Sequence, residues 1–329
     1  MAYGVHSDFT LYNREFAGAQ AEVTAQNLNV LNGASGGAIT LDSERHVGYY
    51  DKTTFLPRLT SITARRDQTS TSAQTDTAPG NSEIVKIKLF RKFKPVAMAL
   101  GAWQTMFGTS DPAAFSYLMG RWYQSEKLSS IVNLGIVAVE AALEGQANLV
   151  YDATGQSTKT LTPTHLASGL QLMGDQAQRI VTWVLHSKPD NNLLKQAIAD
   201  KVVNIADLAI RAGTTPYLGR RSVVTDAAAL TDANGSLTDT YNVLGLVPGA
   251  VMLSESEAET IAFQQVTGYE NIFYRFQAEY SLTIGLKGFT WDVSSGGTNP
   301  TDANLGTTTN WDKIATSDKD LCGVRIKVQ

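Results

Sequence analysis

Apolar residues between Asp111 and Gly145 recur at helical spacing and predict one long helix, or two helices joined end to end. Asp111 can cap the first amides, Pro112 suits the first helical position, and Gly145 is a natural stop. At 1.5 Å per residue, the roughly 33 residues between them span about 50 Å. This length is far greater than that of an ordinary helix.

The apolar stripe along this segment changes face. The first stripe comprises Phe115, Leu118, Met119 and Trp122, and the second comprises Leu128, Val132, Ile136, Val139 and Leu143. The two stripes are offset by roughly a quarter to a third of a turn. Either the helix breaks near Gln124–Lys127 and forms two core helices, or a single rod acts as a spine that ties separate layers together.

Residues 53–95 have the pattern of a long β-hairpin. The returning strand carries Val85, Ile87, Leu89 and Phe93 on one face and Lys86, Lys88 and Lys92 on the other. The outgoing strand is predicted around 59–66, the polar tip at 67–82, and Pro95 is expected to end the strand. Since a hairpin with one apolar face is not stable alone, it needs a surface to lie on.

Residues 1–45 resemble an arm, with a weak helical pattern followed by an Asn-rich and then Gly-rich stretch. The segment holds too little apolar surface to offset its own ordering entropy. We expect it to lie on another surface, such as a neighbouring molecule. The alternative is a small helix hairpin that folds on itself.

From about 163 to 260 the pattern indicates a compact α/β domain. Helices are expected to begin at Thr162-Pro163 and at Ser187, strands are expected at 180–185, 221–225 and 242–253, and Asn234-Gly235 marks a tight turn. The chain then returns to strands at 272–284, 289–291 and 322–328.

The composition describes a globular chain of 329 residues, 43% hydrophobic and 18% charged. The most apolar run, Ile131 to Leu143, is too short to span a membrane. The N-terminus lacks the plan of a signal peptide, and the single cysteine, Cys322, excludes an internal disulfide and a multi-cysteine zinc site. These features favour the cytosol.

The charge is unevenly distributed. Residues 45–95 hold ten Lys and Arg against four acidic residues, a net +6, whereas the rest of the chain holds 17 against 27, a net −10. The overall charge of −4 argues against a dedicated nucleic-acid binder. We favour docking of the basic segment on the acidic surface of a sister subunit over a nucleic-acid arm. The candidate assembly contacts are Arg65, Arg66, Lys86, Lys88 and Lys92.

No group of residues converges on a reaction. Gly33-Ala-Ser-Gly-Gly37 matches the G-x-S-x-G elbow, but no helix is predicted after it, so we expect a flexible loop. His6, His46, His165 and His186 lack metal-ligand spacing. Glu255, Glu257 and Glu259 are expected to form a solvated face, or alternatively a contact for basic residues. We predict no catalytic, cofactor-binding or metal-binding residue, and no enzymatic activity.

The order of these parts resembles the major capsid proteins of tailed bacteriophages, which have the Hong Kong 97 fold. Stretches that carry the resemblance are Leu166–Ala199, with its strand Arg179–His186 and its second helix opened by Pro189-Asp190, then Arg221–Asp226 and Ala278–Gly285. The resemblance implies an α+β capsid fold. Its parts are an N-arm (1–45), an extended loop (46–95), a peripheral domain (96–162 and 261–329) with the spine helix 111–145, and an axial domain (163–260).

The resemblance implies a protein that assembles with itself, as hexamers and pentamers, into an icosahedral shell around double-stranded DNA, without sequence-specific DNA binding or a membrane. It leaves room for separate scaffolding, portal and decoration proteins, and it implies assembly in the host cytoplasm. Because the chain starts directly with the arm, we expect any scaffold to be a separate protein. The competing hypotheses are a self-assembling protein compartment or another virion protein and, least favoured, a soluble hydrolase.

Overall fold

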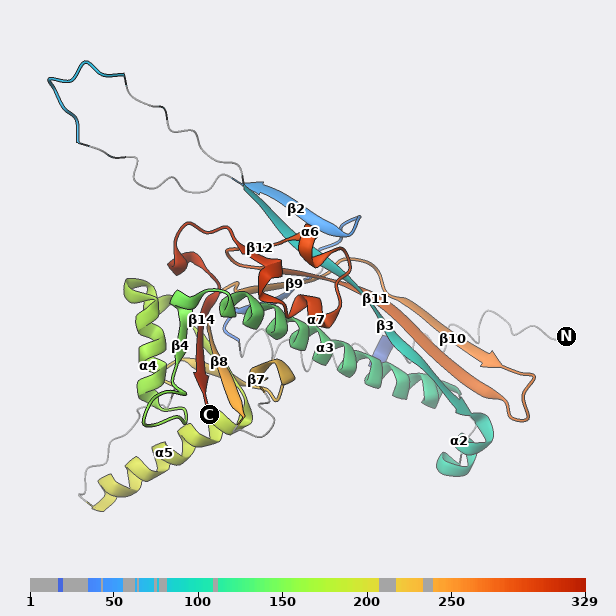
Figure 1. Ribbon diagram of the computed structural model, residues 1–329. Helices are drawn as coiled ribbons and strands as arrows, with labels where there is room; N and C mark the ends of the chain where they lie inside the picture. Colours follow the sequence, from blue (N-terminus) through green and yellow to red (C-terminus); the bar gives the residue numbers. More distant parts are fainter. Residues whose placement is uncertain are drawn as a thin grey trace.

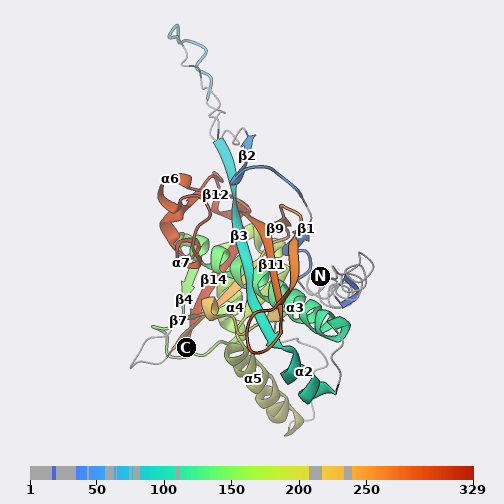
Figure 2. The same cartoon turned by 90° about the vertical axis from the view of Figure 1, so that its right-hand side faces the viewer.

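The computed structural model describes residues 17–19, 35–42, 44–55, 63, 65–73, 76, 82–108, 112–206, 217–232 and 239–329. The molecule is elongated, and a long helix connects a long sheet with a shorter one (Figures 1 and 2). The helices are α2 (Leu100–Phe107), α3 (Pro112–Glu144), α4 (Pro163–Leu172), α5 (Ser187–Ala206), α6 (Val293–Gly296) and α7 (Asp302–Leu305). The strands are β1 (Ile39–Asp42), β2 (Tyr50–Phe55), β3 (Ser82–Ala99), β4 (Val150–Asp152), β5 (Thr182–Leu185), β6 (Arg221–Val224), β7 (Thr231–Asp232), β8 (Thr240–Leu246), β9 (Val251–Glu255), β10 (Thr260–Val266), β11 (Phe273–Leu286), β12 (Phe289–Trp291), β13 (Trp311–Lys313) and β14 (Gly323–Val328).

Three predictions fall largely outside this part of the chain. They are most of the arm at 1–45, the cap at Asp111 and the turn at Asn234-Gly235.

The long sheet has the strand order β1-β9-β11-β3-β2, and β10 pairs with the other end of β11. Strand β3 is 18 residues long and pairs with β2 at its start and with β11 over the rest, the two ladders meeting at Ile87. The predicted hairpin therefore exists. The strand that pairs with the start of β3 is Tyr50–Phe55, and most of the outgoing strand predicted around 59–66 lies outside the described residues.

Pro95 lies inside β3, so the prediction that it ends the strand was also wrong. The ladder between β3 and β11 changes register here, and Lys94 and Pro95 together face the single residue Gln277. This two-to-one arrangement is a β-bulge, where a residue without an N–H costs the ladder nothing. The strand consequently continues to Ala99.

Helix α3 is one continuous rod of 33 residues, as one of the two alternatives predicted. Its first half buries Phe115, Met119 and Tyr123 in a small aromatic core with residues of β11. Its second half enters the main core, where Ile136 and Leu143 are fully buried. Trp122, predicted to be buried, is 47% exposed, because the long sheet covers the helix face that carries the neighbouring residue Tyr123.

The shorter sheet has the order β4-β14-β8-β5-β6, with β7 beside β8. Strand β14 lies in its interior, not with the strands after 261 as the predicted peripheral domain implied, because its register pairs it with β8 and β4. The predicted strand 242–253 is two strands, β8 and β9, in different sheets, and a turn at Gly249 (φ +67°) separates them.

Both faces of the shorter sheet are covered by helices. Ile326 of β14 packs against Gly169 of α4, and the neighbouring residue Arg325 points to the opposite face, toward α3. Helix α4 begins as predicted, with the hydroxyl of Thr162 accepting a hydrogen bond from the amide of His165 at 3.2 Å. The spine helix therefore serves both sheets.

We predict that Gly323→Ala destabilises the subunit by about 2 kcal/mol, since overpacking typically costs this much. A Cβ at Gly323 would lie 2.0 Å from the carbonyl oxygen of Gly245, which is backbone and cannot rotate away. Gly155→Ala is the matched control, because a Cβ there meets no heavy atom within 4 Å. Urea unfolding of both variants measures the difference, and equal midpoints would contradict the close approach of β14 and β8.

Candidate assembly interface

The hairpin carries exposed groups away from the body of the subunit. Strand β2 and the start of β3 extend beyond the core, and residues 65–73 lie further out in both views (Figures 1 and 2). All of residues 65–73 are exposed, and no ion pair links Arg65 or Arg66 to another residue that the structure describes. We call the exposed parts of residues 44–55, 65–73 and 83–92 the hairpin surface.

Aromatic and aliphatic side chains are exposed at the base of this surface. Val47 is 99% exposed, Tyr49 57% and Phe90 40%. The rings of Tyr49 and Phe90 meet edge to face with centroids 5.8 Å apart. Apolar surface of this kind gains about 25 cal/mol per Å² when another molecule covers it.

The lysines predicted to share one basic face of β3 have different surroundings. Lys86 is partly buried, with its ammonium 3.7 Å from the carboxylates of Glu44 and Asp51. Lys92 is exposed. The predicted basic face is therefore not a continuous row of free cations.

The structure contradicts the prediction that Lys88 is available as an assembly contact. Its side chain is 0% exposed, forms an ion pair with Glu257 and donates to the carbonyl oxygen of His46 at 3.3 Å. Burial and the positive charge of Lys88 lower the pKa of His46. The prediction that the Lys88 side chain contacts a neighbouring subunit was thus wrong. For the other four candidates the assembly role stays a prediction: Arg65, Arg66, Lys86 and Lys92.

A second buried lysine explains where the stripe on α3 changes face. Lys127 is 2% exposed, and its ammonium lies 2.6 Å from Glu255 and also contacts Glu259. Burial alone would lower the pKa of Lys127, but the two carboxylates outweigh it and hold this pKa above its usual value. The acidic run is thus a contact for basic residues inside the subunit, the alternative to a solvated face.

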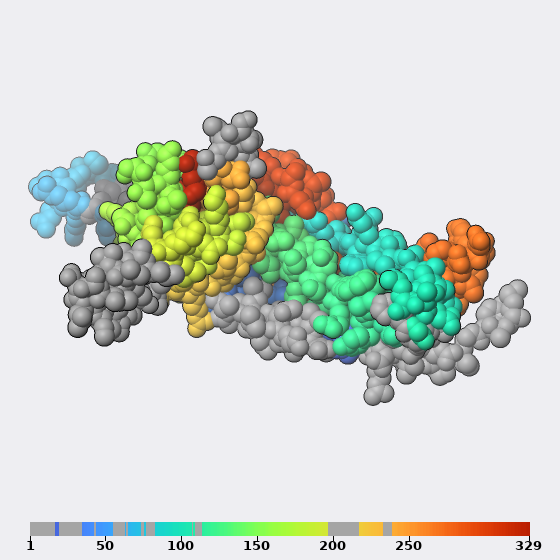
Figure 3. Space-filling model, turned by 90° about the horizontal axis from the view of Figure 1, so that it is seen from below, coloured from blue at the N-terminus to red at the C-terminus, as the bar shows by residue number. Residues whose placement is uncertain are grey.

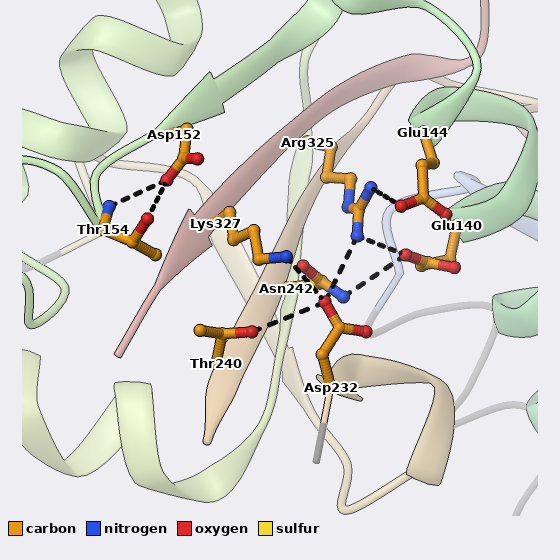
Figure 4. Close-up of polar contacts among 9 residues, drawn as sticks. All are labelled: Glu140, Glu144, Asp152, Thr154, Asp232, Thr240, Asn242, Arg325 and Lys327. Carbon is orange, nitrogen blue, oxygen red and sulfur yellow. Dashed lines mark hydrogen bonds and ion pairs between the residues drawn. The ribbon is translucent and has the colours of Figure 1, made fainter. Parts of the chain in front are cut away.

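A third polar cluster, missed by sequence reasoning, attaches the end of α3 to the shorter sheet (Figure 4). The guanidinium of Arg325 is 3% exposed and lies 2.8 Å from Glu140 and 3.2 Å from Glu144. Asp232 is 3.7 Å from Arg325 and 3.1 Å from Lys327. Two features of the sequence could have indicated this cluster. Glu140 lies inside the apolar run of α3, and Arg325 lies inside the apolar strand β14.

A groove and an apolar end lie away from the hairpin tip. The groove, of about 610 Å³, lies between β3 and α3 and is lined by Lys92, Phe93, Lys94, Val96, Trp122, Ser125 and Glu126. At the end of the long sheet, α2 and the β10–β11 turn lie together, opposite α4 and α5 (Figure 3). Met106, Tyr269 and Ile272 are exposed there. The subunit thus presents uncovered apolar groups at both ends of its long sheet.

The geometry at Ser35 does not suit a nucleophile. Ser35 is fully buried, its hydroxyl donates to the carbonyl oxygen of Ile39 at 3.2 Å, and strand β1 follows it rather than a helix. Among the described residues no three His, Cys, Asp or Glu side chains gather as a metal site. No helix in the described ranges is long and apolar enough to cross a membrane.

A family model described as Gp13-like, major capsid protein 13-like, matches residues 8–325. The chain belongs to this family of major capsid proteins. This capsid protein is therefore a structural protein that forms the shell of a virion, and it is not an enzyme. The hypothesis of a soluble hydrolase was wrong.

Solved phage capsids have the same fold. The capsid of Ralstonia phage GP4 matches with a TM-score of 0.51 and 10% identity over 89% of this chain and 87% of that one. The capsid asymmetric unit of cyanophage Pam1 matches with a TM-score of 0.50 and 12% identity over 88% of each chain. No curated protein sequence matches the capsid protein. The predicted α+β capsid fold is confirmed.

We predict that Lys127→Met destabilises the capsid protein by roughly 3 kcal/mol, because two partly buried carboxylates lose their cation. Adding Glu255→Gln and Glu259→Gln should restore most of the loss. Lys52→Met is the control, since Lys52 pairs with Glu83 on the surface and both side chains are about half exposed. Urea unfolding measures all three variants, and a loss for Lys127→Met no larger than that of the control would refute this role.

Proposed function

We propose that the capsid protein assembles by laying the hairpin surface of one subunit over a neighbouring subunit, in hexamers and pentamers that close into an icosahedral shell around the double-stranded DNA of a tailed phage. The observation that carries the proposal is the hairpin itself. It extends beyond the core of its own subunit and exposes cationic and aromatic groups there.

The strand pairing makes the hairpin suitable for this role. Strand β3 is fixed in the body by its ladder to β11 and continues without a break into its pairing with β2. The direction of the hairpin is thus set by the core. When such an extension contacts a different surface on the next subunit, the contact is heterologous, and repetition by rotation generates closed rings.

Charge supports the orientation of this contact. The segment 45–95 carries an excess of positive charge over an otherwise acidic chain. Lys88 pairs inside the subunit and Lys86 lies near two carboxylates. Among the described residues of this segment, the exposed cations without an ion pair to another described residue are Arg45, Arg65, Arg66, Lys92 and Lys94. Exposed charges of this kind affect register and association rate more than affinity.

The two sheets support the proposed division into domains. The shorter sheet with α4 and α5 supports an axial domain over most of 163–260, extended by β4 and β14, whereas β9 within that range belongs to the long sheet. The long sheet and α3 correspond to the peripheral domain and the extended loop. Assembly in the host cytoplasm and separate scaffolding, portal and decoration proteins belong to the same proposal.

We expect the double variant Arg65→Glu/Arg66→Glu to fold normally but to form far fewer shells. Both side chains are exposed, so subunit stability should change by less than about 0.5 kcal/mol. Reversed charges at the hairpin would meet an acidic neighbour and repel it. Sedimentation velocity gives the shell yield, and circular dichroism gives the fold.

The control is Lys159→Glu/Lys195→Glu, which changes the net charge equally at exposed residues outside the hairpin. Shells should form from this variant at nearly the native yield. If the hairpin variant assembles as well as the control across a range of salt concentrations, the hairpin surface does not guide assembly through its charge.

A further inference from the structure

The contact between the end of α3 and the shorter sheet holds more acidic than basic groups. We call Glu140, Glu144, Asp232, Arg325 and Lys327 the spine cluster (Figure 4). Three carboxylates share two cations there. Asp152 of β4 lies close by, but its carboxylate accepts hydrogen bonds from the amide and hydroxyl of Thr154.

Glu140 is the most enclosed of these carboxylates. Its side chain is 12% exposed, against 48% for Glu144 and 41% for Asp232. It must share the single guanidinium of Arg325 with both of them. A carboxylate with little water and part of one cation is a poor place for a full negative charge.

A buried acceptor beside Glu140 lacks a donor. Asn242 of β8 is fully buried, and its amide nitrogen donates to Glu140 at 3.3 Å. The amide oxygen of Asn242 has no hydrogen-bond partner among the described residues. A neutral carboxyl has an O–H that can donate to such an oxygen, which a carboxylate lacks, and the amide of an asparagine can turn to receive it.

We propose that Glu140 holds a proton in the folded subunit near neutral pH, and that the attachment of α3 to β14 is therefore a proton-sensitive joint. Burial, the largest influence, raises the pKa of Glu140 from 4.5 to about 7. Arg325 opposes this rise and the nearby Glu144 and Asp232 add to it. This proposal depends on the fold of the subunit and is independent of the proposed assembly of the subunits.

The direction in which pH changes the stability follows from the binding of a proton to Glu140. Because the folded chain holds this proton more tightly than the unfolded chain, stability falls as the pH rises through the interval from 4.5 to about 7. Above that interval Glu140 is ionised in the folded subunit, and its buried charge lowers the stability by a constant amount. Below it the carboxyl is neutral in both states.

Infrared difference spectroscopy of the full-length protein tests the proton directly. The native protein should show the band of a protonated carboxyl at about pH 6 that is lost by about pH 8. Glu140→Gln should lack this band. Glu144→Gln, which changes the more exposed partner of the same Arg325, should keep it but lose it at a lower pH than the native protein, since the charge of Glu144 adds to the rise of the pKa. A native spectrum without the band at about pH 6 would overturn the proposal, whatever the variants do.

Urea unfolding gives the second readout, at protein concentrations too low for assembly. The native midpoint should fall between about pH 6 and about pH 8, and Glu140→Gln should remove at least about half of that fall. Glu144→Gln should retain a fall, at a lower pH than in the native protein. A Glu140→Gln protein with the native pH dependence would also overturn the proposal.

Discussion

Two buried cations fix the long helix α3 to the rest of the subunit, Lys127 near its middle and Arg325 opposite its end. Apolar packing alone would leave a rod of 33 residues with much freedom to rotate or slide, since its stripe changes face part-way along. An ion pair buried at a single place on the helix penalises both movements, because a shift would leave a charge unpaired. The relative placement of the two sheets depends on this fixed rotation.

The hairpin inherits its direction from the same arrangement. Strand β3 lies over the first half of α3 and continues past the core to pair with β2. The side chains that it presents, such as Tyr49 and Phe90, find little cover in their own subunit. A subunit built this way has a buried core of its own and leaves apolar groups of the hairpin uncovered, which suits the shell-forming role of its family.

Local signals made part of the fold predictable. Helix α3 begins with a proline and ends before a glycine, and α4 follows a threonine cap, so both could be located from sequence. Strand partners could not, because pairing joins residues far apart in the chain. The sequence alone therefore did not show that β14 pairs with β8 or that β2 pairs with the start of β3. The partners of Lys127 and Arg325 were hidden for the same reason.

Buried pairing also changes what the basic segment can contribute to assembly. Reversing every lysine of β3 would break the contact between Lys88 and Glu257 and damage the fold before any neighbour was met. A loss of shells in such a variant would then say nothing about the interface. Only cations that remain exposed, such as Arg65, Arg66 and Lys92, can separate folding from association. The net charge of the segment in the sequence overstates the positive charge available to a neighbour, because ion pairs inside the subunit already neutralise part of that charge.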